Sequence, residues 1–171
     1  DTGSNWKAKI ASAKAAGYDG IVYLNRYEGL SKETVFRLHS QGLSEKLDRM
    51  SDAEFRRAVP EAEDSYIVFD AKQVIQQNES SAPDSGGAAF SRTPGDQTQT
   101  DAFKRWFAGS RVVDAQGNPL VVYHGTRREF TTFDYSKIGE QGRAEGAGFY
   151  FTNSEKVASG YGAAMEVFLS I

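Results

Sequence analysis

One stretch in the last third of the chain constrains its fold and chemistry more than any other. Residues 121–126 read VVYHGT, an apolar run that ends in His124 and Gly125. Residues 146–152 read GAGFYFT, a glycine-punctuated aromatic run that carries Tyr150, and a further tyrosine follows at Tyr161. The missing Cβ of Gly125 is expected to let a ligand approach the backbone. A histidine at a strand end, with two aromatic faces nearby, suits a flat, polar, ribose-bearing ligand.

This pattern resembles the NAD-binding half of ADP-ribosyltransferases of the His-Tyr-Glu type, the group that holds diphtheria toxin and the poly(ADP-ribose) polymerases. Within that group it is most similar to the ADP-ribosyltransferase domains of phage and prophage polyvalent proteins. The resemblance implies that His124 hydrogen-bonds a ribose hydroxyl of NAD and that the Gly125 backbone holds the nicotinamide carboxamide. Thr126 stands where the family carries Ser or Thr. A lone histidine is more often a core or turn residue, so this interpretation depends on the whole motif.

The same resemblance implies that Tyr150 and Tyr161 hold the nicotinamide ring between them. Stacking on aromatic faces is a reasonable source of affinity for such a ring. Taken alone, either tyrosine could equally be a core aromatic residue. The chain departs from the polymerases at Ala158, where they carry a serine that bonds the nicotinamide amide.

A second motif, SYIVFDAKQV at residues 65–74, resembles the last catalytic strand of the polymerases. There the first position carries a glutamate that stabilises the ribosyl cation, whereas this chain has Ser65, which cannot supply that charge. Ser65 would still line the catalytic position, and Ser65→Glu is expected to raise NAD cleavage if the remaining cleft is competent. Asp64 is adjacent, but strand alternation should turn it away. Glu28, in the segment NRYEG at 25–29, is the other candidate carboxylate, and its simpler interpretation is a solvated loop residue.

Composition limits the other kinds of function. The net charge is −3 and there is no basic run, so the electrostatic footprint of a nucleic-acid-binding protein is absent. The absence of cysteine excludes disulfides, thiolate zinc sites and cysteine nucleophiles, and with two histidines we expect no metal. We find no membrane-spanning run and no signal peptide, so the expected location is the cytoplasm of a bacterial cell, in a phage- or prophage-encoded protein. Because the chain begins with Asp1, we expect it to be a piece of a longer protein.

Periodicity predicts helices at residues 4–16, in two or three pieces within 31–59, and at 101–108 and about 153–161. It predicts strands at 65–70, 112–114, 120–124, 148–152 and 165–171, a buried strand at 21–24, and a short helical turn up to residue 75. Capping-box patterns begin at Ser51 and Thr152. Residues 134–147 are predicted to form a glycine-rich loop.

The expected domain organisation has two complementary halves. Residues 1–75 resemble the C-terminal half of an ADP-ribosyltransferase, with 31–64 as a helical insertion, and 101–171 resemble the N-terminal, NAD-binding half. In the superfamily the insertion's place holds the loop that meets the acceptor; a helical surface decoration is an equally good interpretation. Residues 76–100, poor in aliphatic side chains, are expected to be a flexible linker with an average span of roughly 25–30 Å.

The halves occur in the reverse of the family order, which leaves three explanations. The domain is circularly permuted, two chains exchange halves in a homodimer, or the chain straddles two tandem domains. Isolated halves would expose strand edges and a core face, so permutation is preferred.

The sequence therefore predicts an α+β fold of the ADP-ribosyltransferase type, a split β-sandwich with flanking helices and NAD between two small facing sheets. The expected function is an NAD-dependent mono-ADP-ribosyltransferase or NAD glycohydrolase, with NAD as substrate and an unidentified macromolecule, expected to be a protein, as acceptor. The predicted catalytic residues are His124, Tyr150, Ser65 and Glu28. The alternative is a catalytically degenerate NAD- or ADP-ribose-binding module, or a structural part of a phage polyvalent protein.

Overall fold

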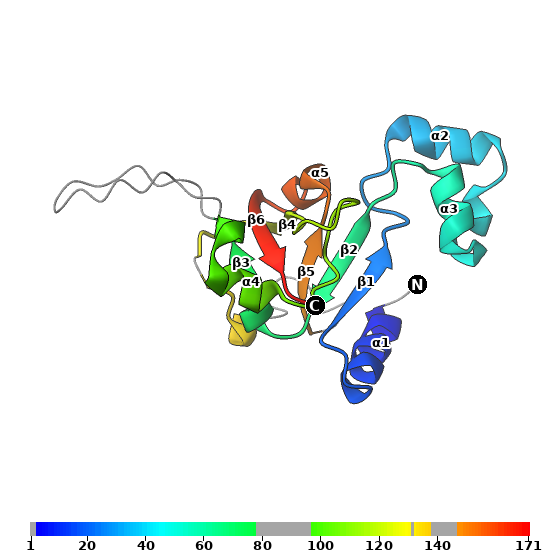
Figure 1. Ribbon diagram of the computed structural model, residues 1–171. Helices are drawn as coiled ribbons and strands as arrows, with labels where there is room; N and C mark the ends of the chain where they lie inside the picture. The colour runs from blue at the N-terminus through cyan, green and yellow to red at the C-terminus, as the bar shows by residue number, and fades with distance from the viewer. Residues whose placement is uncertain (1–2, 78–96, 131, 138–146) are drawn as a thin grey trace.

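The computed structural model describes residues 3–77, 97–130, 132–137 and 147–171 (Figure 1). The helices are α1 (Gly3–Ala15), α2 (Lys32–Ser40), α3 (Asp52–Ala58), α4 (Asp101–Phe107) and α5 (Glu155–Ser159). Short 3-10 turns are η1 (Ser44–Arg49), η2 (Ala71–Gln73), η3 (Gln97–Gln99) and η4 (Tyr135–Lys137). The strands are β1 (Gly20–Leu24), β2 (Asp64–Val68), β3 (Val74–Gln76), β4 (Val122–Thr126), β5 (Phe149–Thr152) and β6 (Ala163–Leu169). This mixture of helices and antiparallel strands confirms the predicted α+β class.

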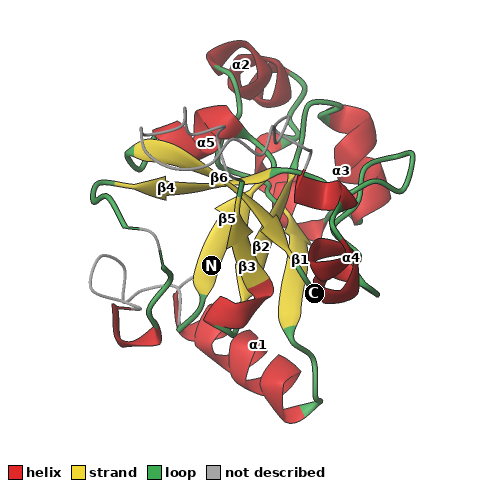
Figure 2. Ribbon diagram, turned by 60° about the vertical axis from the view of Figure 1, so that its left-hand side comes forward, coloured by secondary structure: helices red, strands yellow, loops and turns green. Residues whose placement is uncertain are grey.

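Strands from both ends of the chain form one antiparallel sheet in the order β1-β2-β5-β4-β6-β3. β2 pairs with β5, and β3 pairs with β6, so the segments before and after residues 78–96 share two strand interfaces. The connection between β5 and β4 is a single pair, Tyr123 opposite Thr152. The sheet therefore splits into two groups of three strands, which Figure 2 shows crossing in the middle of the molecule.

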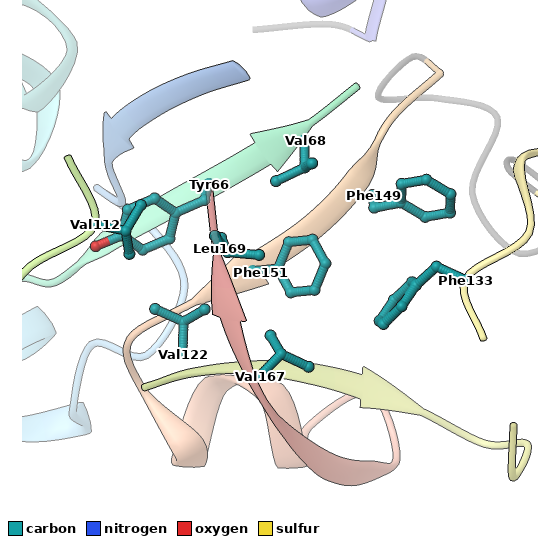
Figure 3. Close-up of a cluster of buried hydrophobic side chains, with 9 residues drawn as sticks. All are labelled: Tyr66, Val68, Val112, Val122, Phe133, Phe149, Phe151, Val167 and Leu169. Carbon is teal, nitrogen blue, oxygen red and sulfur yellow. The ribbon is translucent and has the colours of Figure 1, made fainter. Parts of the chain in front are cut away.

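The main core lies between these two groups of strands. Side chains from β2 and β5 point toward side chains from β4 and β6, as Figure 3 shows. The buried members are Tyr66, Val68, Val112, Val122, Phe133, Phe149, Phe151, Val167 and Leu169. Tyr66 and Val68 alternate along β2 with Ser65 and Ile67, so the latter two lie on the opposite face of that strand. Ser65 therefore does not belong to the main core.

A second buried cluster holds the insertion together. Leu38 of α2, Leu47 of η1 and Phe55 of α3 pack with Leu24, Val59 and Ala62. Ser31 caps α2, and Ser51 forms the predicted capping box with Glu54 at the start of α3. The prediction of a helical segment in two or three pieces is thus confirmed for the part of the chain between β1 and β2. In Figure 1, α2 and α3 lie at one end of β1 and β2, and α1 lies at the other end.

Four predicted elements differ from the structure. The strand predicted at residues 21–24 is an edge strand, with Val22 51% exposed, so it is not buried as expected. Val74–Gln76 pairs with β6 instead of extending a helical turn. Near residues 112–114 only an isolated bridge between Val113 and Pro119 forms, because the turn at 114–118 leaves little room for a ladder. Ser154, and not Thr152, caps α5, which ends at Ser159.

Most of the predicted linker and of the glycine-rich loop lies outside the described residues. The described ends of the predicted linker have regular structure: Gln76 belongs to β3, and Gln97–Gln99 forms η3. α4 follows directly, as predicted, and Gly109 with φ of 86° comes two residues after its last residue. No helix within the described ranges is long and apolar enough to span a membrane.

Candidate functional site

The loop after β1, the start of β2 and the end of β5 lie at the end of the sheet that also carries α2, α3 and α5 (Figure 1). β2 begins and β5 ends here, and the antiparallel β4 begins beside the end of β5, so residues that are distant in sequence meet. Ser65 lies opposite Thr152, and Tyr150 lies opposite Ile67. Side chains directly opposite each other share a face, so Ser65 and Tyr150 lie on the same face of the β2–β5 pair.

His124 is half-buried among the rings of Phe130, Phe133 and Phe151, whose centroids lie 5.9, 5.1 and 5.5 Å from its own. Its Nδ1 lies 2.9 Å from the carbonyl oxygen of Tyr150. Because a carbonyl oxygen only accepts hydrogen bonds, Nδ1 carries the proton. Burial lowers the pKa of His124, and the bond to Tyr150 opposes part of that shift. The neutral imidazole therefore presents Nε2 as a hydrogen-bond acceptor at pH 7.

His124 reaches Tyr150 through the backbone and not through the tyrosine ring. Strand alternation places the Tyr150 side chain on the face of β5 opposite Phe149 and Phe151. Phe130 and Phe133, which sequence reasoning did not single out, form the wall around the imidazole. Their signal was the aromatic spacing in the segment EFTTF at 129–133, which begins three residues after the end of the histidine motif.

Packing against α5 explains why a glycine stands at position 125. A Cβ at this position would overlap the carbonyl oxygen of Ala158 and lie 2.8 Å from Cβ of Tyr161. The end of α5 fills the space that a Cβ would need, so close packing by itself requires a glycine here. Gly162, with φ of 144°, packs in the same way against the carbonyl group of Thr126. These two glycines bring Tyr161 against the end of β4.

The hydroxyl group of Thr126 is already engaged in the turn that follows β4. Its Oγ1 accepts a hydrogen bond from the backbone N–H of Arg128, at 3.1 Å, and donates to the carbonyl oxygen of the same residue, at 2.9 Å. Thr126 thus shapes the turn that leads from His124 toward Phe130.

Glu28 belongs to this end of the molecule, on the loop after β1. The hydroxyl group of Tyr161, which is 53% exposed, donates a hydrogen bond to Oε1 of Glu28. A Cβ at Gly29, whose φ is 80°, would lie 2.5 Å from Cγ2 of Val157, so this loop presses against α5. The carboxylate is exposed, and it lies beside one of the two tyrosines that the family pattern assigns to nicotinamide.

Asn25 connects Glu28 to Ser65, and sequence reasoning missed it. Its Nδ2 donates to Oε2 of Glu28, at 2.8 Å, and lies 3.3 Å from Oγ of Ser65. Asn25 is 7% exposed and Ser65 is 2% exposed. The available signal was an asparagine directly after a strand with a carboxylate three residues later, a spacing typical of a side-chain-stabilised turn. The Asn25 amide group therefore lies between the buried hydroxyl group of Ser65 and the exposed carboxylate of Glu28.

Two further observations bound the chemistry. Among the residues that the structure describes, no group of three or more His, Cys, Asp and Glu side chains could hold a metal ion. An open groove of about 410 Å³ lies near the same end, lined by Leu30, Lys32, Val35, Phe36, His39 and Ser44. Phe36 in this groove is 74% exposed, an unusual position for a phenyl ring.

Comparison with known proteins supports the resemblance. Residues 114–171 match the family described as ADP-ribosyltransferase in polyvalent proteins. The matched segment includes β4, β5, α5 and β6, and with them His124, Tyr150 and Tyr161. No curated protein and no solved structure matches the chain. The likeness to ADP-ribosyltransferase domains of polyvalent proteins thus rests on this C-terminal segment of the chain.

Proposed function

We propose that this protein uses NAD as a substrate, cleaves the bond between nicotinamide and ribose, and transfers ADP-ribose to a protein or to water. The family match at residues 114–171 supports the class of reaction. The negative net charge and the absence of a basic run favour a protein over a nucleic acid as acceptor. The alternative, a module that binds NAD without cleaving it, is supported by the serine at position 65, where the polymerases carry their glutamate.

His124 has the properties that the proposed substrate requires. Its neutral ring offers Nε2 as an acceptor for a ribose hydroxyl, because Nδ1 is committed to the carbonyl group of Tyr150. We assign Tyr150 and Tyr161 to the nicotinamide ring, with the Gly125 backbone at its carboxamide and Thr126 in the adjoining turn. Aromatic faces of this kind contribute about 1 kcal/mol each to the binding of a flat ring.

The observation that carries the proposal is the hydrogen bond between Tyr161 and Glu28. It places a carboxylate from the loop after β1 next to the tyrosine that follows α5, in a chain whose β2 has no glutamate at position 65. We therefore assign to Glu28 the role that the strand-borne glutamate has in the polymerases. We assign to Ser65, buried beneath Asn25, an indirect role as an anchor.

The reaction balances with these groups. The glycosidic bond breaks and its electron pair leaves with the nicotinamide, so positive charge develops on the ribose. The Glu28 carboxylate stabilises that charge through a preorganised negative group. A water molecule or an acceptor side chain then forms the new bond to the ribose carbon. Glu28 accepts the proton that this nucleophile releases.

The halves of the fold are proposed to form one circularly permuted domain. The pairing of β2 with β5 and of β3 with β6 lets a single chain complete the sheet. Analytical ultracentrifugation with NAD titration tests this. A monomer that binds NAD is expected, whereas NAD binding confined to a dimer would favour exchanged halves.

Two measurements test the function: NAD binding by calorimetry and nicotinamide release by chromatography. Glu28→Gln is expected to lower kcat by about 10²–10³-fold, because it removes a preorganised charge and keeps the side-chain shape. Glu45→Gln makes the same charge change on η1 and is the matched control, expected to leave kcat unchanged. NAD binding without any nicotinamide release would refute the transferase proposal in favour of the binding module.

A further inference from the structure

We propose that Asn25 is a positioning residue, which holds the Glu28 carboxylate toward Tyr161 by clamping it to Ser65. This inference rests on the proposed function, because it gives Glu28 a part in the reaction. It concerns a residue outside the matched segment, on the loop between β1 and α2. Its test separates a failure of Asn25 from a failure of the proposed function.

The side chain of Asn25 is fully used. Its Oδ1 accepts hydrogen bonds from the backbone N–H groups of Tyr27, at 3.2 Å, and of Glu28, at 2.9 Å. Its Nδ2 faces Oε2 of Glu28 and Oγ of Ser65. The oxygen therefore shapes the turn, whereas the nitrogen connects the carboxylate to the sheet. These two tasks can be separated by substitution.

The loop is held on its outer side as well. Arg26 donates to Asp52, at 2.6 Å, and to the carbonyl oxygen of Leu47. The hydroxyl group of Tyr27 donates to Asp48. Arg26 and Tyr27 thus attach the loop to the insertion, whereas Asn25 and Glu28 face the site. With its backbone fixed on both sides, the orientation of Glu28 depends on the donors that meet its carboxylate.

This arrangement also explains why the serine and the asparagine occur together. Ser65 is buried, and the amide group of Asn25 covers its hydroxyl. A glutamate at position 65 would have to occupy the volume that the amide now fills. The carboxylate is instead carried by the loop, and the small serine leaves room for the residue that holds it. Misplacement of a catalytic group by 1 Å can cost about 100-fold in rate.

Asn25→Asp is the informative variant, because it is isosteric. It keeps an oxygen for the two backbone N–H groups, but it replaces the donor to Glu28 by a second carboxylate. We expect kcat for nicotinamide release to fall by about 100-fold, with KM for NAD unchanged within about twofold. Asn118→Asp is the matched control: its Nδ2 also donates to a carboxylate, that of Asp114, in an exposed turn before β4, and kcat should not change.

The pH profile separates positioning from a general structural defect. Two carboxyl groups within hydrogen-bond reach share a proton at acid pH, and the introduced carboxyl group can then donate to Glu28 as the amide did. The loss of kcat in Asn25→Asp relative to the wild type should therefore become about tenfold smaller as the pH is lowered from 8 to 5.5. A deficit that stays constant with pH would overturn the proposal.

A thermal-unfolding cycle tests the contact without relying on activity. Asn25→Asp should lower Tm in the wild-type background. In the Glu28→Gln background the repulsion between the two carboxylates is absent, so the drop in Tm should be less than about half as large. Equal shifts in the two backgrounds would show that Asn25 does not hold Glu28. If the wild type binds NAD but releases no nicotinamide, the proposed function fails, and the catalytic role of Asn25 fails with it. Normal release by Asn25→Asp refutes the positioning role alone.

Discussion

The hydroxyl group of Tyr161 donates a hydrogen bond to the carboxylate of Glu28, a residue 133 positions earlier in the chain. The contact joins the loop after β1 to the end of α5, and so connects the two segments of the chain at the candidate site. Tyr161 has two separable features there, a ring for stacking and a hydroxyl group that meets the carboxylate. Substitution can remove them one at a time.

Tyr161→Phe should keep NAD affinity within about twofold and lower kcat by about tenfold or more, because it removes the bond to Glu28 and keeps the ring. Tyr161→Ala should also weaken binding, by about 1 kcal/mol for the lost stacking. Calorimetry and nicotinamide release on the same samples distinguish the two effects. An unchanged kcat in Tyr161→Phe would mean that the hydroxyl group does not support Glu28 in the reaction.

His124 should make stability depend on pH. Burial lowers the pKa of its imidazole in the folded protein, so the unfolded chain binds the proton more readily. The stabilisation is fully present above the ordinary pKa of about 6.5 and is lost as the pH falls toward the folded pKa. Tm of the wild type should therefore fall between pH 7 and pH 5 more steeply than Tm of His124→Gln. NAD affinity should fall over the same range, because protonation removes the acceptor at Nε2. Parallel Tm curves for the two proteins would contradict the assignment.

Gly125→Ala should destabilise the fold by about 1–3 kcal/mol, because the new Cβ meets the carbonyl group of Ala158 and the backbone must move. Gly117→Ala is the control, since nothing lies within 4 Å of a Cβ there and only its φ of 85° is unfavourable. Its cost should be about 1 kcal/mol. Urea unfolding measures both. If Gly125→Ala costs no more than the control, the space beside β4 is free for a ligand, as the sequence alone suggested.

Phe36 should affect the acceptor and not NAD. It is exposed in the groove on α2, eight positions after Glu28. The groove is also lined by Lys32 and His39, and none of the six described residues that line it carries a carboxylate. Phe36→Asp should lower the transfer of labelled ADP-ribose to proteins of a bacterial lysate by about tenfold, as the loss of a buried aromatic contact does at other interfaces. Nicotinamide release into water should stay within about twofold. Equal loss in both assays would place Phe36 in the fold and not in acceptor binding.

The sequence predicted local features well and long-range ones less well. The capping box at Ser51 and the strand that carries Ser65 follow from short patterns, and both are present. Whether a strand lies at an edge depends on which partners it finds, so the apolar residues of β1 were mistaken for a buried strand. β3 exists because β6 pairs with it, a contact that spans most of the chain. Asn25 and Phe133 were missed because their roles come from tertiary neighbours.

Ser65→Glu should not raise NAD cleavage, contrary to what the sequence alone suggested. Ser65 is 2% exposed and lies under the amide group of Asn25, so a glutamate there would bury a charge and displace the group that meets Glu28. An unpaired buried charge costs several kcal/mol, so a marked loss of Tm is expected. Ser65→Ala, which removes only the hydroxyl group, should cost about 1 kcal/mol. Nicotinamide release decides the matter: a gain by the folded Ser65→Glu variant would show that the strand still carries the catalytic position, and that Glu28 does not replace it.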